Sequence, residues 1–193
     1  MKSNVFIISG PSGSGQDSVI EGLKKYFEIE RIITTTTREP REGESQGDPY
    51  YFISKEEFEN GIKEGRFAEY ANHYNENFYG VAKDELERVN RSGKIGIWRI
   101  DYKGVESVKK MYPKIVSILI SVSDLKILAD RIRKRDDVGD EYVKERMKYT
   151  EEFMKHTDIY DHIVYNEEGK LDETTKEVAE IIKNDVDKHE KSD

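Results

Sequence analysis

Short apolar runs alternate with amphipathic stretches along most of the chain. The apolar runs predict strands at Val5–Ser9, Ile95–Ile100, Ile115–Ser121 and His162–Tyr165. Apolar residues at helical spacing predict helices at Asp17–Phe27, Lys83–Arg91, Lys103–Met111, Leu125–Arg135, Glu141–Lys155 and Leu171–Val186. Because strands alternate with helices, the pattern predicts an α/β fold in which a parallel sheet is flanked by crossover helices.

One segment interrupts this alternation. Residues 34–81 are rich in Thr, Gly, Tyr and Asn, and they contain a single short helical pattern around Glu56–Lys63. This composition predicts a lobe inserted into a core made of residues 1–33 and 82–193. A chain of 193 residues is long enough for such a core with a small insertion and too short for two large domains, so we expect one domain.

A glycine-rich loop follows the first apolar run. Residues 10–18 read Gly-Pro-Ser-Gly-Ser-Gly-Gln-Asp-Ser, and the glycines have the spacing of the P-loop pattern G-x-x-x-x-G-K-[ST]. In a P-loop the backbone N–H groups surround nucleotide phosphates, the lysine reaches the β and γ oxygens, and the hydroxyl holds Mg²⁺. Here Gln16 replaces the lysine and Asp17 replaces the hydroxyl residue.

The loop therefore predicts a phosphate cradle with inverted charge. A plain Gly/Ser turn is the alternative, but the strand pattern before the loop and the helical pattern after it favour nucleotide binding. The residues expected to bind ATP are Gly10, Ser12, Gly13, Ser14, Gly15, Gln16, Asp17 and Ser18.

A second phosphate-binding pattern lies in the inserted segment. The stretch from Thr34 reads Thr-Thr-Thr-Thr-Arg-Glu-Pro-Arg-Glu-Gly-Glu, so Arg38 and Arg41 flank a stiffening proline. Two guanidinium groups can grip one phosphate, and Tyr50 can add a hydroxyl donor. An isolated Arg-x-x-Arg is usually a solvated turn paired with nearby glutamates. Together with the P-loop, it predicts an enzyme that holds two nucleotides end to end.

Composition narrows the possible partners. The net charge of −8 argues against a nucleic-acid-binding surface, so phosphate recognition must come from local arginines. The absence of cysteine excludes a disulfide framework and a thiolate metal site. Because the first apolar run is too short for a signal peptide and no run approaches membrane-spanning length, we expect a cytoplasmic protein without membrane contact. The sequence does not set the oligomeric state.

With these motifs in place, the chain resembles the guanylate kinase family over nearly its whole length. The most specific part is Thr-Thr-Arg-x-Pro-Arg-x-Gly-Glu, with Gly47, Tyr50 and Phe52 in step. The resemblance implies ATP-dependent phosphoryl transfer to GMP or dGMP with Mg²⁺ as the cofactor of ATP. It also implies three parts: a core of the P-loop NTPase type, a lobe that binds the nucleoside monophosphate, and a helical lid at about residues 131–150.

The resemblance also assigns side chains. The GMP phosphate falls to Arg38, Arg41, Tyr50 and Tyr79; guanine to Thr34, Glu69 and Asp101; the transferring phosphoryl group to Arg131, Arg135 and Arg146; and the adenine region to Asn166. A carboxylate such as Glu69 suits guanine because it can accept from N1–H and N2–H together. Two simpler alternatives stay open: Glu69 as an exposed strand residue, and Asp101 as the cap of the next helix.

Three positions depart from the family pattern. Gln16 removes a cation, Val81 replaces a Ser or Thr expected to bond guanine O6, and Arg99 stands where an aspartate would organise Mg²⁺. The first and last are reciprocal, because the loop gains an anion at Asp17 while the facing strand end gains a cation. We therefore expect Arg99 to act toward the γ-phosphate and Asp17 to hold the metal.

Two other functions remain open. A non-catalytic module of the same fold would keep the lobe for binding a nucleotide or a phosphorylated peptide. It would have no use for Arg131 and Arg135, so their presence favours the enzyme. A kinase for another nucleoside monophosphate is the third possibility, and it is motivated by Val81.

Overall fold

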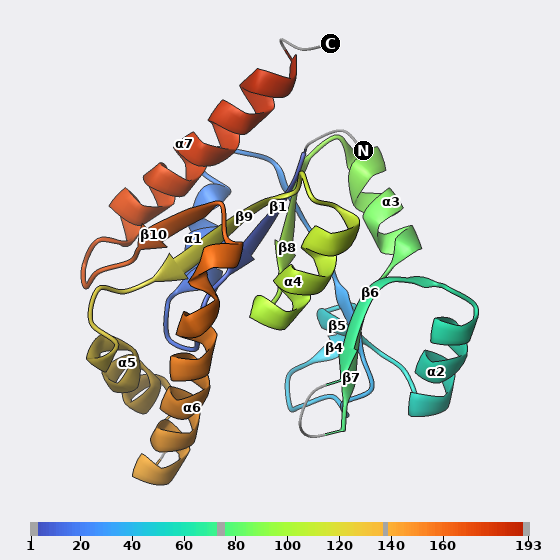
Figure 1. The fold of residues 1–193 in the computed structure, drawn as a ribbon, viewed down its shortest axis with the longest axis horizontal. Helices are drawn as coiled ribbons and strands as arrows, with labels where there is room; N and C mark the ends of the chain where they lie inside the picture. Colours follow the sequence, from blue (N-terminus) through green and yellow to red (C-terminus); the bar gives the residue numbers. More distant parts are fainter. Residues whose placement is uncertain (1–3, 73–75, 137–138, 191–193) are drawn as a thin grey trace.

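A parallel sheet forms the centre of the molecule in the computed structural model, which describes residues 4–72, 76–136 and 139–190 (Figure 1). In spatial order its strands are β10 (His162–Tyr165), β9 (Val116–Ser121), β1 (Val5–Ser9), β8 (Ile95–Arg99) and β2 (Ile29–Arg31). All neighbouring pairs are parallel, as the α/β pattern predicts. The edge strand β2 was not predicted, because three residues of mixed polarity give no periodic signal.

The predicted helices are present with small changes at their ends. They are α1 (Gln16–Leu23), α3 (Lys83–Ser92), α4 (Tyr102–Met111), α5 (Lys126–Asp136), α6 (Asp140–Phe153), which runs into the 3₁₀ turn η1 (Met154–Ile159), and α7 (Leu171–Glu190). Helix α1 ends four residues before the predicted Phe27. The chain after Leu23 closes into tighter turns, in which the N–H of Lys24 donates to the carbonyl of Glu21.

A second sheet occupies the segment where the sequence predicts an inserted lobe. Its strands are β4 (Ser45–Gln46), β5 (Pro49–Phe52), β3 (Thr34–Thr36), β7 (Phe78–Ala82) and β6 (Phe67–Asn72), with α2 (Lys55–Lys63) packed beside them. Helix α2 starts at a capping box: the Ser54 hydroxyl accepts from the N–H of Glu57, whose carboxylate accepts from the N–H of Ser54.

Two apolar clusters hold the elements together. Alternate residues of β1 face opposite sides of the central sheet, so Phe6 and Ile8 pack toward α1 and α7, while Val5 and Ile7 pack into the other cluster. That other cluster also contains Ala68 of β6 and Val81 of β7. Burial on both faces fixes β1, and with it the loop at its carboxyl end.

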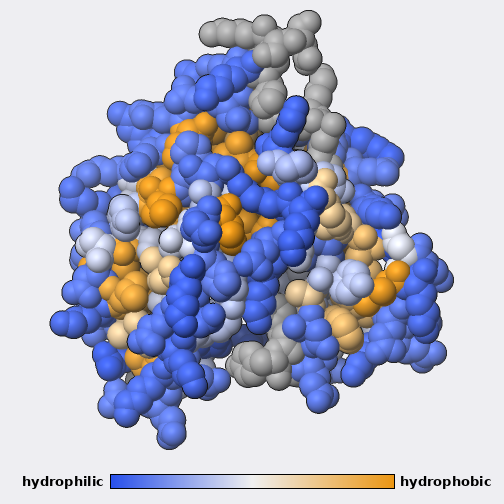
Figure 2. All heavy atoms as spheres, in the orientation of Figure 1, coloured by the Kyte–Doolittle hydropathy of each residue, from blue (hydrophilic) through white to orange (hydrophobic). Residues whose placement is uncertain are grey.

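The outer surface matches the composition. Figure 2 shows a face that is mostly hydrophilic, with apolar atoms in separate patches. Among the described residues, none of the helices has the length and apolar character needed to cross a membrane.

Candidate active site

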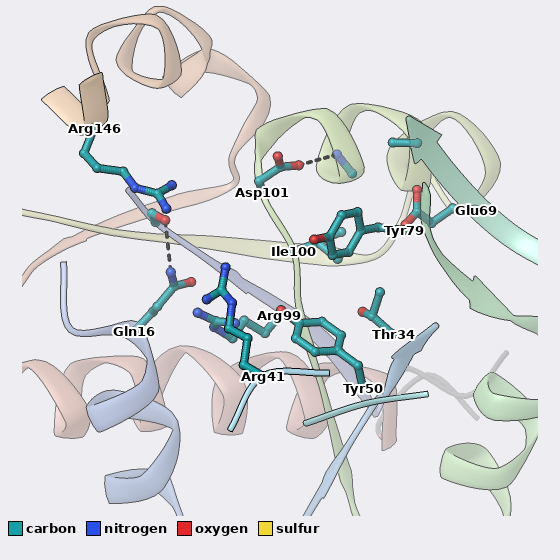
Figure 3. Close-up of a pocket in the computed structure, with 13 residues that line it drawn as sticks. Gln16, Thr34, Arg41, Tyr50, Glu69, Tyr79, Arg99, Ile100, Asp101 and Arg146 are labelled. Carbon is teal, nitrogen blue, oxygen red and sulfur yellow. Dashed lines mark hydrogen bonds between the residues drawn. The ribbon is translucent and has the colours of Figure 1, made fainter. Parts of the chain in front are cut away.

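One cavity draws its walls from both sheets. It has a volume of about 350 Å³ and is lined by Gly10, Gln16, Thr34, Arg41, Tyr50, Glu69, Ala71, Tyr79, Arg99, Ile100, Asp101, Gly104 and Arg146. In Figure 3 Gln16, Arg41, Arg99 and Arg146 gather at one end, and Glu69, Tyr79 and Asp101 at the other. Ten of the residues that the sequence assigns to ATP, GMP or catalysis therefore share one cavity with three that it did not single out.

The glycine-rich loop joins β1 to α1 in the expected place. Gly13 and Gly15 have φ of +84° and +87°, a region that side-chain-bearing residues rarely adopt. A Cβ on Gly15 would also lie 2.3 Å from Asn166 Nδ2. The amide of Gln16 folds back over the loop, where Nε2 donates to the carbonyl of Gly10 at 3.1 Å. Gln16 thus supplies a polar contact within the cradle, and the cradle lacks the lysine charge.

The two exchanged charges are in contact. The parallel register places Arg99 opposite Ile8, just before the loop, and Arg99 Nη2 lies 3.1 Å from Asp17 Oδ2. Arg31, at the end of β2, approaches the other carboxylate oxygen of Asp17 at 2.9 Å. The Nε of Arg99 is buried and has no hydrogen-bond partner among the described residues. Arg31 was missed by the sequence analysis, since only the sheet order brings β2 close to the loop.

The acidic residues of this region do not form a resident metal centre. In the described part of the chain, no three His, Cys, Asp or Glu side chains come together as a metal-binding group. Asp17 and Ser18 do offer exposed oxygens on the first turn of α1. Such a donor set fits a Mg²⁺ ion that arrives with nucleotide phosphates, because Mg²⁺ usually keeps waters and takes only one or two protein ligands.

At the other end of the cavity, Glu69 is buried. It is only 5% exposed, so the alternative of an exposed strand residue is wrong. Its Oε2 has no hydrogen-bond partner among the described residues. Burial, reinforced by the negative charge of Asp101, raises the pKa of Glu69 to about 8. A buried acceptor without a partner is suited to a ligand that brings N–H donors, as guanine does.

Asp101 caps α4, as one of the two interpretations predicted. Its Oδ1 accepts from the N–H of Gly104 at 3.0 Å, and its Oδ2 accepts from the hydroxyl of Tyr149 at 2.7 Å. Because Asp101 also lines the cavity, capping and ligand contact are compatible. Nothing in the sequence pointed to Tyr149, which lies on the distant helix α6.

The residues predicted to bind the GMP phosphate fall into two groups. Arg41, Tyr50 and Tyr79 line the cavity, and the rings of Tyr50 and Tyr79 meet edge to face at 6.1 Å. Arg38 is absent from the cavity lining. Its guanidinium pairs with Glu44 at 2.9 Å and donates to the carbonyl of Glu39 at 2.7 Å. In this structure Arg38 therefore fastens the turn that carries Arg41.

The lid arginines also differ from one another. Arg146 lines the cavity and points toward Gln16 in Figure 3, while its guanidinium lies 5.0 Å from the ring centroid of Tyr142. Arg131 instead donates to the carbonyls of Gly13 at 3.3 Å and Asn166 at 2.9 Å. The side chain of Arg135 lies outside the described residues.

Asn166 is tied to the back of the loop. Its Nδ2 donates to the carbonyl of Ser14 at 2.8 Å, and Asn166 is 5% exposed. A second cavity of about 210 Å³ opens here, lined by Gly13, Gly15, Ser18, Arg131, Asn166, Glu167, Glu168, Gly169 and Leu171. The predicted ATP residues thus lie on both sides of the loop: Gly10 and Gln16 face the first cavity, and Gly13, Gly15, Ser18 and Asn166 face the second. Of the remaining ones, Ser12 and Ser14 belong to the loop, and Asp17 lies in the first turn of α1.

Comparisons with known proteins give a consistent result. The family model described as guanylate kinase matches residues 2–185. The guanylate kinase of Rickettsia felis is 37% identical over 182 residues, which cover 94% of this chain and 93% of that protein. The guanylate kinase of Helicobacter pylori strain 26695 is 36% identical, covering 93% of this chain and 86% of that one. The crystal structure of guanylate kinase from Anaplasma phagocytophilum superposes with a TM-score of 0.71 at 27% identity, covering 94% of this chain and 85% of that chain.

Proposed function

The chain belongs to the guanylate kinase family, and on that premise we propose that it transfers the γ-phosphoryl group of ATP to GMP or dGMP across the 350 Å³ cavity. The observation that carries the proposal is the composition of this cavity. Residues of the glycine-rich loop line one end, and a buried carboxylate with an open acceptor lies at the other. A phosphate donor and a guanine base can then occupy one continuous space.

Guanine would be selected at the carboxylate end. Ionised Glu69 can accept from N1–H and N2–H, and adenine presents no such pair of donors. Thr34, which is 8% exposed and lines the same cavity, can supply a hydroxyl toward O6. Because the wrong base would leave buried polar groups unpaired, such a site can discriminate by about 10⁴-fold.

The acceptor phosphate would lie between the arginines of the lobe and the core. Arg41, Tyr50 and Tyr79 bind it, and one of its oxygens attacks the γ-phosphorus of ATP. The bond to the β–γ bridging oxygen breaks, so ADP leaves with the electron pair and no covalent enzyme intermediate forms. Catalysis of this kind rests on alignment and on neutralisation of the phosphate charge.

The altered loop lacks the lysine, so another residue would have to neutralise the phosphate charge. In this proposal Arg99 would leave Asp17 for the γ-phosphate, and Asp17 is the residue that would hold Mg²⁺. Arg31 keeps Asp17 in place during the exchange, since it already holds the other oxygen. When bound with ATP, Mg²⁺ would shield the phosphate oxygens. Arg146 approaches from α6, and Arg131 and Asn166 hold the loop from behind.

The proposal also divides the chain into moving parts. Residues 1–33 and 82–193 would form the core, residues 34–81 the acceptor lobe, and residues at about 131–150, with Arg135 among them, the lid. Closure of lobe and lid would bring the two nucleotides together and exclude water from the phosphoryl group.

A coupled assay of ADP release tests the function. At saturating Mg-ATP we expect turnover with GMP and dGMP and little with AMP, CMP or UMP. Preferred turnover of another monophosphate would favour the kinase with a different acceptor. If no acceptor is phosphorylated while calorimetry still detects GMP binding, the chain is the non-catalytic module.

A further inference from the structure

Tyr149 makes a contact with Asp101 that no sequence motif predicts. The hydroxyl of Tyr149 donates to Asp101 Oδ2 at 2.7 Å, and the N–H of Gly104 donates to Oδ1 at 3.0 Å. The ring of Tyr149 is half-buried, packs against the core, and has its centroid 6.0 Å from that of Tyr102. Asp101 is therefore held on one oxygen by α4 and on the other by α6.

The two donors are compatible with ligand contact, because Asp101 also lines the cavity. A carboxylate has about four lone-pair sites on its two oxygens, so it can accept from more than two donors. Burial, followed by the negative charge of Asp101, raises the pKa of Tyr149, so its hydroxyl stays a donor at neutral pH. The two donors hold the carboxylate of Asp101 in one orientation. Glu69, in contrast, has an oxygen with no partner among the described residues.

The same face of α6 also reaches the end of the cavity that we expect to hold the phosphates. Arg146 lies three residues before Tyr149 on α6, and residues at this spacing are neighbours on a helix surface. Arg146 lines the cavity at the end that we expect to hold the phosphates. At the base end of the cavity, where Glu69 and Asp101 lie, α6 contacts Asp101 through Tyr149.

We propose that Tyr149 is a positioning residue for guanine recognition: it orients Asp101 toward the N–H donors of the base and ties that orientation to α6. The inference rests on the proposed function, because it concerns the same cavity. It predicts that loss of one hydroxyl on α6 weakens selection for the guanine amino group, although this hydroxyl touches Asp101 rather than the base.

The test compares Tyr149→Phe with a matched control, Tyr160→Phe. Tyr160 is a buried tyrosine of the same core, and its hydroxyl lies 2.9 Å from that of Ser9. Calorimetry measures the Kd for GMP and for inosine monophosphate, which lacks the 2-amino group; the kcat for GMP and the Tm are measured in parallel. For Tyr149→Phe we expect the Kd for GMP to rise about tenfold, the size of a lost hydrogen bond to a charged group. We expect the Kd for inosine monophosphate to change by less than about threefold and kcat by less than about twofold.

The outcomes separate the inference from the function. Tyr160→Phe should keep the wild-type ratio of the two Kd values even if it lowers Tm as much as Tyr149→Phe does. If Tyr149→Phe binds GMP normally, or loses both nucleotides equally, the positioning role is overturned while the proposed function stands. A wild-type protein that binds neither nucleotide would overturn both.

Discussion

Glu69 and Asp101 lie in one cavity but are held in opposite ways. Two donors fix Asp101, whereas Glu69 is buried with an unpartnered oxygen and a pKa raised to about 8. At neutral pH the Glu69 carboxyl of the free protein is therefore mostly protonated. In the proposed function Glu69 accepts from guanine, so binding of GMP would have to remove this proton.

This proton sets a pH dependence for GMP binding. Below about pH 8 the Kd for GMP should fall as pH rises, by close to tenfold per unit well below the pKa, and it should level off above it. Calorimetry between pH 6 and pH 9 measures the effect. A Kd that stays constant over this range would contradict the assignment of Glu69.

Glu69→Gln is the control for this titration. It should bind GMP weakly and without the pH dependence. Because the folded-state pKa of Glu69 is raised above the unfolded value of 4.5, its contribution to stability is full below pH 4.5 and is lost as pH rises through about 8. The Tm of Glu69→Gln should therefore rise relative to the Tm of the wild type as pH increases from 5 to 9.

Arg99 is the second residue whose role can be measured directly. If it neutralises the γ-phosphate, Arg99→Ala should lower kcat by about 10³-fold, or roughly 4 kcal/mol, with little change in the KM for GMP. Arg31→Ala is the matched control, since it removes the other guanidinium from Asp17. It should cost only a few-fold in kcat. If Arg99→Ala lowers the Tm but leaves kcat unchanged, the contact between Arg99 and Asp17 is a structural ion pair without a role in catalysis.

At the scale of elements, the hairpin of β6 and β7 joins the core to the end of the cavity where Glu69 lies. Glu69 and Val81 are directly paired across these strands, so their side chains lie on the same face. Val81 is fully buried in the apolar cluster and is absent from the cavity lining. The oxygen of Glu69 is thus left next to a side chain that cannot donate.

Val81→Thr should supply the missing donor. The new hydroxyl would strengthen GMP binding by about 1 kcal/mol, the net value of one hydrogen bond, and would move the pH midpoint of binding below 8. Val81→Ala removes the methyl groups without adding a hydroxyl, and it should lose stability without the gain in affinity. An unchanged KM for GMP in Val81→Thr would remove this position from base recognition.

All strands of the central sheet except β2 were predictable because they are mostly apolar. Val5–Ser9 is buried at every position, and such a run directly before a glycine-rich loop leaves few alternatives. The strands of the second sheet escaped prediction for the opposite reason. Thr34–Thr36 is buried yet polar, and Ser45–Gln46 has only two residues, so neither carries a hydrophobic period.

The site was predictable where a motif fixes the local geometry and less so where tertiary contacts decide. Gly10, Gln16, Arg41 and Tyr50 reach the cavity as their motifs indicate. Arg38 and Arg131 have the expected residue type but are committed to Glu44 and to the carbonyl of Asn166. Sequence spacing does not reveal such partners, because they come from other elements.

At the scale of the whole molecule, the proposed division into core, lobe and lid predicts closure. In small-angle scattering the radius of gyration should fall when an analogue that joins both nucleotides is bound, since it draws the lobe and the lid onto the core. GMP alone and ADP alone should each produce a smaller decrease. A radius that does not change with the joined analogue would support a rigid binding module.

The contact between Asp17 and Arg99 has a consequence for ATP itself. The carboxylate is an anion tethered to the chain, and a tethered group competes at an effective concentration on the order of millimolar. If Arg99 acts on the γ-phosphate as proposed, ATP must displace this internal competitor, and its apparent affinity is reduced by the fraction of molecules in which Arg99 is still held. In that proposal, the exchanged charges make the empty enzyme selective for polyanions that carry enough charge to displace Asp17 from Arg99.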